Sequence, residues 1–185
     1  MWGFFKADSA YHVDALDNYY AYDPDKARQL HAEAGQSELA FEVFYTPSPE
    51  GQAGAEALQA QLAEVGVTIT LKPLTVQTDF FPDAKGAPMY FFPLQRASLN
   101  KITRVYVPGS YGNVCTWDDP ELNAAVAELQ KVREDSPEGI AAWEAVQEQA
   151  YTSAVSIFAL FGLQGAAWND ERVGNPEFLF IATAP

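Results

Sequence analysis

The sequence predicts an α/β fold, with a mixed sheet built on a βαβ crossover and helices on both faces. Two alternating apolar stretches, Leu39 to Tyr45 and Val67 to Leu71, have the period of two that is typical of strands. Between them, apolar residues from Ala55 to Val65 recur at helical spacing, and Gly66 is suited to end the helix in a left-handed conformation. A helical connection of this length joins parallel strands of one sheet.

Composition narrows the class of protein. Apolar residues make up 48% of the 185 residues, with 12 Phe, 9 Tyr and 4 Trp, so the chain can bury a core and is not intrinsically disordered. A formal charge of -14 predicts no nucleic-acid partner, because a polyanion is not attracted to phosphates. Since Cys115 is the only cysteine, an internal disulfide and a cysteine-based metal cluster are excluded.

Residues 1–22 are predicted to be an irregular aromatic lead-in that packs over a surface, and residues 23–185 a single domain. Three helix starts in this domain share one signal, a capping residue followed by proline. They are Asp23-Pro24, Asp119-Pro120 and Ser136-Pro137. The first of these helices should stop at Gly35.

The remaining segments carry weaker signals. A short helix is expected over residues 78–85, a short buried strand over 89–92 and a two-faced apolar strand over 155–161. Gly109, Gly112 and their polar neighbours are turn signals, so residues 94–116 are predicted to be the longest loop region.

Catalytic and metal-binding patterns were sought without success. His12 and His31 have no second ligand at helical spacing, so neither a metal site nor a cofactor is expected. The sequence has no G-x-S-x-G, G-x-x-x-x-G-K-[ST] or G-x-G-x-x-G motif. A thiol enzyme or regulatory α/β module using Cys115 stays open as an alternative, because a His partner could lie nearby in space.

The polar and aromatic stretch after the strand at 89–92 is the candidate ligand surface. In open α/β sheets, ligands bind beyond the carboxyl ends of the strands. The side chains there suit a small polar molecule, and an ordinary surface loop with a packed tryptophan is the alternative. The candidate residues are Gln95, Arg96, Ser98, Asn113 and Trp117.

Three motifs carry a family resemblance. YDPDKARQLHAEAG, at residues 22–35, is similar to the Y-D-P-x-K-A-x-x-L-L-x-E-A-G segment of bacterial extracellular solute-binding proteins of family 5, which serve ABC importers of oligopeptides, dipeptides, nickel and some sugars. AEALQAQLAEVGVTITL (55–71) and TWDDPELNAAV (116–126) resemble the family's later segments in the same order. The resemblance covers essentially the whole chain, but only the C-terminal part of the family.

That resemblance implies the second lobe of a periplasmic-binding-protein-like (type II) fold, without its N-terminal lobe. The expected protein is no enzyme but the substrate-binding component of an ABC importer, a lipoprotein tethered outside the cell. Its expected partners are a small-molecule or peptide solute, the missing N-terminal lobe and the ABC permease subunits. Gln95, Arg96 and Ser98 would face the cleft.

One departure from the family's pattern bears on the ligand. Where peptide-binding members commonly carry a W-x-x-D-Y-x-D-P-like run, this chain has LQRASLNKIT. Arg96 and Lys101 therefore stand where an anion would be expected, and they favour acceptors or negative groups on the ligand.

Overall fold

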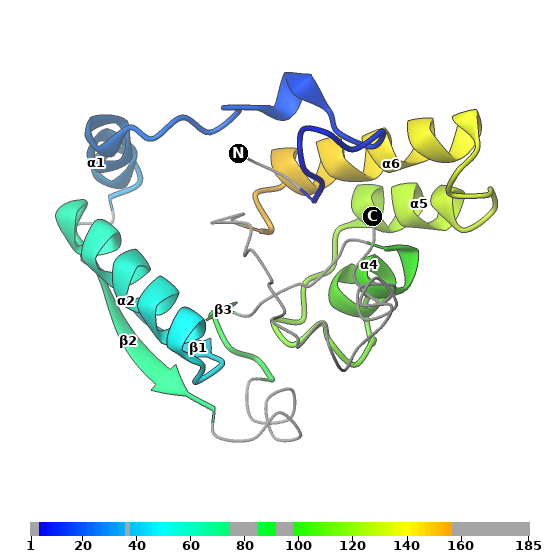
Figure 1. Ribbon diagram of the computed structural model, residues 1–185. Helices are drawn as coiled ribbons and strands as arrows, with labels where there is room; N and C mark the ends of the chain where they lie inside the picture. Colours follow the sequence, from blue (N-terminus) through cyan, green and yellow to red (C-terminus); the bar gives the residue numbers. More distant parts are fainter. Residues whose placement is uncertain (1–3, 36–37, 75–84, 92–97, 157–185) are drawn as a thin grey trace, which may run out of the picture.

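The computed structural model describes residues 4–35, 38–74, 85–91 and 98–156 (Figure 1). The strands are β1 (Leu39–Tyr45), β2 (Val67–Pro73) and β3 (Met89–Phe91). The helices are α1 (Pro24–Glu33), α2 (Pro49–Glu64), α4 (Leu99–Tyr106), α5 (Pro120–Leu129) and α6 (Pro137–Thr152), with a 3₁₀ turn, η1, at Asp14–Leu16. None of these helices has the length and apolar character needed to cross a membrane.

The sheet confirms the predicted crossover. Its order is β2-β1-β3, and β1 runs parallel to both neighbours, with Leu39 opposite Val67 and Val43 opposite Met89. The helix α2 joins β1 to β2 and covers one face of the sheet (Figure 1). On that face the alternating apolar residues of β1 and β2 are buried against Leu58 and Leu62 of α2.

The opposite face of the sheet has an exposed part near β2 and a packed part near β3. Near β2 it is exposed and polar, and Lys72 Nζ lies 3.1 Å from Glu42 Oε1 across the strands. At its β3 side, Phe44 and Tyr90 pack with Val114 from the segment that follows α4. The carboxyl end of β3 and the segment after α4 are therefore neighbours in space.

A second, larger core lies among α4, α5 and α6. It contains Ile102, Tyr106, Leu122, Val126, Leu129, Trp143, Val146 and Ala150, together with Phe4 from the lead-in. The lead-in contacts α6, since Phe5 and Tyr11 lie edge-on to Trp143 and the side-chain Nε2 of Gln147 donates a 2.9 Å hydrogen bond to the carbonyl of Tyr11. The division of the chain at residue 22 stays a prediction.

The three capping-residue-plus-proline signals are confirmed. Asp23, Asp119 and Ser136 each accept a hydrogen bond from a first-turn backbone N–H of α1, α5 and α6 respectively. Gly35 follows α1 with φ +66°, the left-handed conformation that glycine adopts without strain.

The prediction of a loop over residues 94–116 is wrong. The helix α4 occupies residues 99–106, because Ser98 caps its start and Ile102 and Tyr106, one helical turn apart, are buried in the core. The turn signals act only after the helix, where Gly109 has φ +75°. The helix expected at 78–84 and the strand expected from residue 157 lie outside the described residues, while Val155 and Ser156 are irregular.

Candidate functional site

The predicted ligand surface begins where β3 ends. Gln95 and Arg96 lie outside the described residues, so Ser98 is the first of the candidates with a known position. Its hydroxyl oxygen accepts a 3.4 Å hydrogen bond from the backbone N–H of Lys101 and caps α4. Ser98 therefore sets the start of α4, the helix between the strand β3 and the segment that contains Asn113 and Trp117.

Asn113 and Trp117, two further candidates, are linked to each other. The amide nitrogen of Asn113 donates to the carbonyls of Tyr106 (3.2 Å) and Trp117 (2.6 Å), and its amide oxygen accepts from the backbone N–H of Trp117 (2.9 Å). Asn113 is buried, whereas Trp117 is 36% exposed. The buried amide thus fixes the loop that presents the tryptophan, and a contact of either residue with a ligand stays a prediction.

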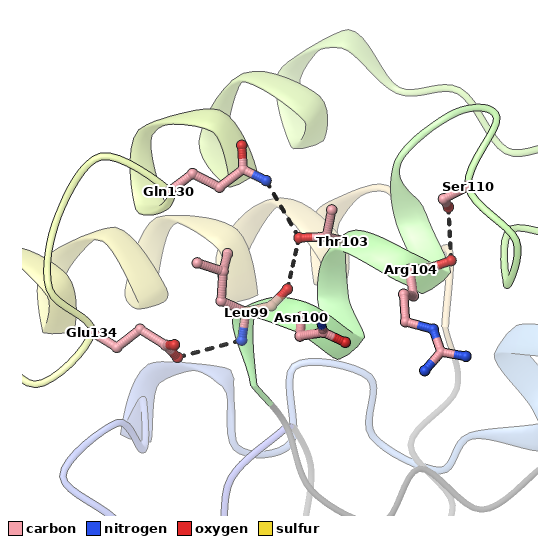
Figure 2. Close-up of a pocket in the computed structure, with 7 residues that line it drawn as sticks. All are labelled: Leu99, Asn100, Thr103, Arg104, Ser110, Gln130 and Glu134. Carbon is pink, nitrogen blue, oxygen red and sulfur yellow. Dashed lines mark hydrogen bonds between the residues drawn. The ribbon is translucent and has the colours of Figure 1, made fainter.

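An open hollow of about 430 Å³ lies over the outer side of α4. It is lined by Leu99, Asn100, Thr103, Arg104, Ser110, Gln130 and Glu134 (Figure 2). These residues come from α4, from the turn after it and from the connection between α5 and α6. The hollow is therefore assembled from three parts of the chain.

One wall of the hollow is fixed by hydrogen bonds. The Glu134 carboxylate accepts a 3.3 Å hydrogen bond from the backbone N–H of Leu99, so it acts as a second cap of α4. Thr103 donates from its hydroxyl to the carbonyl of Leu99 at 2.7 Å, and Gln130 donates to the Thr103 hydroxyl at 3.5 Å. Figure 2 shows these groups in a row on the side of α4 that faces α5.

The other wall carries the positive charge of Arg104. Its guanidinium carbon lies 6.0 Å from the centre of the Tyr111 ring, and the Ser110 hydroxyl donates to the Arg104 carbonyl at 2.7 Å. Within the described ranges, no carboxylate lies within 4.0 Å of the guanidinium. Arg104 can therefore pair with an anionic or acceptor group on a ligand.

Sequence reasoning missed Arg104 and Glu134. Arg104 lies in the segment that was predicted to be a loop. The spacing of Ile102 and Tyr106 is helical, and this spacing would have placed Arg104 on the side of a helix opposite to these two residues. Glu134 carries no signal in the sequence, because its contact with Leu99 joins residues 35 positions apart.

Cys115, the candidate thiol, lies in the segment between α4 and α5 and is half-buried. Burial raises the pKa of its thiol, which lowers the fraction of nucleophilic thiolate.

The chain is similar in fold to solved solute-binding proteins. A putative peptide binding protein, AppA, from Clostridium difficile matches with a TM-score of 0.65 at 14% identity, over 83% of this chain and 33% of that one. The ABC transporter substrate binding protein CtaP from Listeria monocytogenes matches with a TM-score of 0.66 at 23% identity and the same coverage. DppA from Helicobacter pylori, solved in complex with the peptide STSA, matches with a TM-score of 0.63 at 20% identity, over 83% and 31%.

These likenesses show the fold, a lobe of the type II periplasmic-binding-protein-like class. The chain spans about a third of the length of the structures it matches. No curated protein matched the chain. The model of the bacterial extracellular solute-binding proteins, family 5 Middle, matches residues 1–104, which is more than half of the 185 residues. The chain therefore belongs to the family 5 bacterial extracellular solute-binding proteins, a family of receptors rather than enzymes.

Proposed function

We propose that this chain is the C-terminal lobe of the substrate-binding component of an ABC importer, and that it closes over a small solute together with an N-terminal lobe. Its membership of family 5 is the observation that carries this proposal. In two-lobed receptors, hinge closure encloses the ligand, and binding shifts the receptor towards the closed form. The partners would be the solute, the N-terminal lobe and the permease subunits, with the receptor tethered outside the cell.

The ligand surface would lie at the start of α4 and along its outer side. Gln95, Arg96 and Ser98 would face the solute, and the hollow that begins at Leu99 extends the same surface. Arg104 adds a cation to those of Arg96 and Lys101. In the hollow, the Glu134 carboxylate accepts from the backbone N–H of Leu99, so the guanidinium of Arg104 favours a solute with a carboxylate or other negative group.

A screen of the two-lobed receptor tests both parts of the proposal. Solutes of matched size and different charge, such as acidic, neutral and basic dipeptides and short sugars, are compared by thermal shift and then by calorimetry. We expect binding of at least one solute, with acidic members preferred. A receptor that binds none of them would overturn the transport role.

Arg104→Gln should weaken the binding of an acidic solute about 10- to 150-fold, because a charged hydrogen bond contributes about 1.5–3 kcal/mol. Arg28→Gln is the matched control, since it removes the same charge from α1, where Arg28 already pairs with Asp25 at 2.6 Å. Equal effects of the two variants would show that net charge, and not the hollow, sets the preference.

We further propose that the chain has no catalytic activity and that Cys115 is a packing residue. Its raised thiol pKa is the opposite of what activates a nucleophile. Alkylation of Cys115 under conditions that preserve the fold should leave solute affinity unchanged. Loss of a measurable turnover on alkylation would favour the thiol-enzyme alternative.

A further inference from the structure

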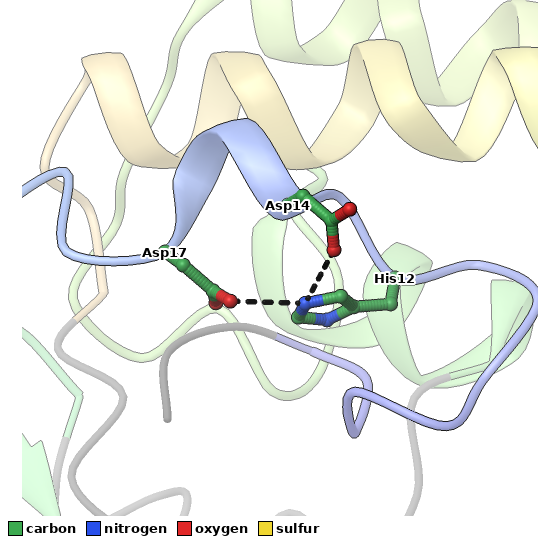
Figure 3. A group of neighbouring side chains, drawn as sticks. All are labelled: His12, Asp14 and Asp17. Atoms are coloured by element: carbon green, nitrogen blue, oxygen red, sulfur yellow. Dashed lines mark hydrogen bonds and ion pairs between the residues drawn. The ribbon is translucent and has the colours of Figure 1, made fainter.

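The lead-in brings three metal-ligating side chains together. His12 Nε2 lies 3.2 Å from Asp17 Oδ2 and 3.4 Å from Asp14 Oδ1, and the three ligand atoms all lie within 4.8 Å of one another (Figure 3). The side chain of His12 is only 9% exposed, so its imidazole has a fixed position. A nitrogen ligand that is largely buried distinguishes this group from a cluster of surface carboxylates.

The backbone holds the three residues in this arrangement. The N–H of Asp17 donates to the carbonyl of Asp14 at 3.1 Å across η1, and Asn18 follows with φ +59°, which reverses the chain. Leu16 is buried, and Gln147 of α6 holds the carbonyl of Tyr11. The segment is therefore tied to α6 directly before the cluster, and Leu16 within the cluster is buried.

The two separations from His12 Nε2 match those of ligands on one small metal ion. Zinc binds imidazole nitrogen at about 2.0–2.1 Å and carboxylate oxygen at about 2.0–2.2 Å, so two ligand atoms at the tetrahedral angle lie roughly 3.3–3.5 Å apart. The two distances from His12 Nε2 are 3.2 and 3.4 Å. An ion could bind between these atoms with small side-chain rotations.

The charge of the cluster also suits a dication. Within the part of the chain that the structure describes, no Lys or Arg lies within 4.0 Å of either carboxylate, and His12 is their only basic neighbour. With the imidazole neutral, the group carries two negative charges. One nitrogen and two carboxylate oxygens form a donor set that first-row divalent metals accept, with zinc among the strongest.

We propose that His12, Asp14 and Asp17 bind a divalent transition metal of the zinc type, with water in the remaining position. The ion would bind at His12 Nε2 between the two carboxylates, and the neutral imidazole would carry its one proton on Nδ1. Because the ion binds the folded turn, it would fasten the lead-in to α6 and raise the stability of the chain by mass action.

The chain has two histidines, which makes the test direct. The chain with Cys115→Ser, which removes the thiol as a competing ligand, is titrated with zinc chloride while the imidazole C–H resonances are followed by NMR. We expect the resonances of His12 to shift and saturate at one equivalent, and those of His31 to stay in place. Calcium and magnesium should not produce the same shift, because both prefer sites made of oxygen ligands alone.

Calorimetry of variants then identifies the ligands. His12→Gln and Asp14→Asn should each weaken zinc binding at least tenfold, while His31→Gln, the matched control, should not. Asp14 is useful because its side chain is 99% exposed, so its substitution leaves packing intact even if His12→Gln disturbs the fold. Unmoved His12 resonances, or an Asp14→Asn variant that binds zinc like the parent chain, would show that the group is an ion pair and no metal site.

Discussion

Replacing Asn113 by alanine should destabilise the fold as well as the ligand surface. The side-chain amide of Asn113 makes three hydrogen bonds with backbone groups of Tyr106 and Trp117, at 3.2, 2.6 and 2.9 Å. The residue is 9% exposed, so the groups left behind are shielded from water. Asn113→Ala therefore leaves two carbonyls and one N–H without their present partner.

The magnitude follows from those three bonds. A typical intramolecular hydrogen bond contributes about 1 kcal/mol net, so the direct loss is about 3 kcal/mol. Relaxation of the loop reduces this loss, because Trp117 is 36% exposed and water can reach its backbone. We expect the free energy of unfolding to fall by about 2–3 kcal/mol, which moves the urea midpoint by about 1 M when the denaturant slope is near 2–3 kcal/mol/M.

Urea unfolding followed by circular dichroism measures this change. Asn100→Ala is the control, because Asn100 is an exposed residue of α4, and its substitution should change the free energy of unfolding by no more than about 0.5 kcal/mol. Asn113→Asp keeps the volume and the acceptor but turns an oxygen towards two carbonyls, so it should destabilise at least as much as Asn113→Ala. If Asn113→Ala unfolds at the midpoint of the parent chain, the structural role assigned to this amide is wrong.

Asp119→Ala should cost about 1 kcal/mol at pH 7 through the lost cap of α5. The hydrogen bond from the Leu122 N–H is the main cause that lowers the pKa of Asp119, so the stabilisation by this cap is present above the ordinary Asp pKa and is lost as the pH falls through the lowered pKa. The control is Ser136→Ala, which removes an uncharged cap and should therefore cost the same at pH 7 and at pH 3. Equal pH dependence of the two variants would contradict the assignment. Gly54→Ala should destabilise by about 1–2 kcal/mol net, because a Cβ would lie 2.6 Å from the Phe91 ring, a clash that outweighs the gain of about 1 kcal/mol in helix propensity. In a Phe91→Leu background the same Gly54 substitution should stabilise the chain by up to about 1 kcal/mol, because only the gain in helix propensity remains, and a stabilising Gly54→Ala in the parent chain would refute the close contact.

The elements that were predicted correctly are those whose sequence signals lie within a short stretch of consecutive residues. The crossover follows from two alternating strands and a helical period between residues 39 and 73, and the structure pairs Leu39 with Val67 in parallel. The three caps are equally local, since Asp23, Asp119 and Ser136 accept hydrogen bonds from N–H groups no more than three residues ahead. Local signals sufficed because each one fixes the backbone of its own segment.

The features that sequence reasoning missed depend on contacts or turns outside such a stretch. Glu134 reaches Leu99 because α5 packs against α4, and the connection that follows α5 lies at the start of α4. His12, Asp14 and Asp17 are close in sequence, yet their spacing is not that of an α-helix, and a 3₁₀ turn followed by a residue of positive φ brings their ligand atoms together. Helical spacing therefore does not predict which side chains meet in an irregular segment, where a turn can bring together side chains two and five residues apart.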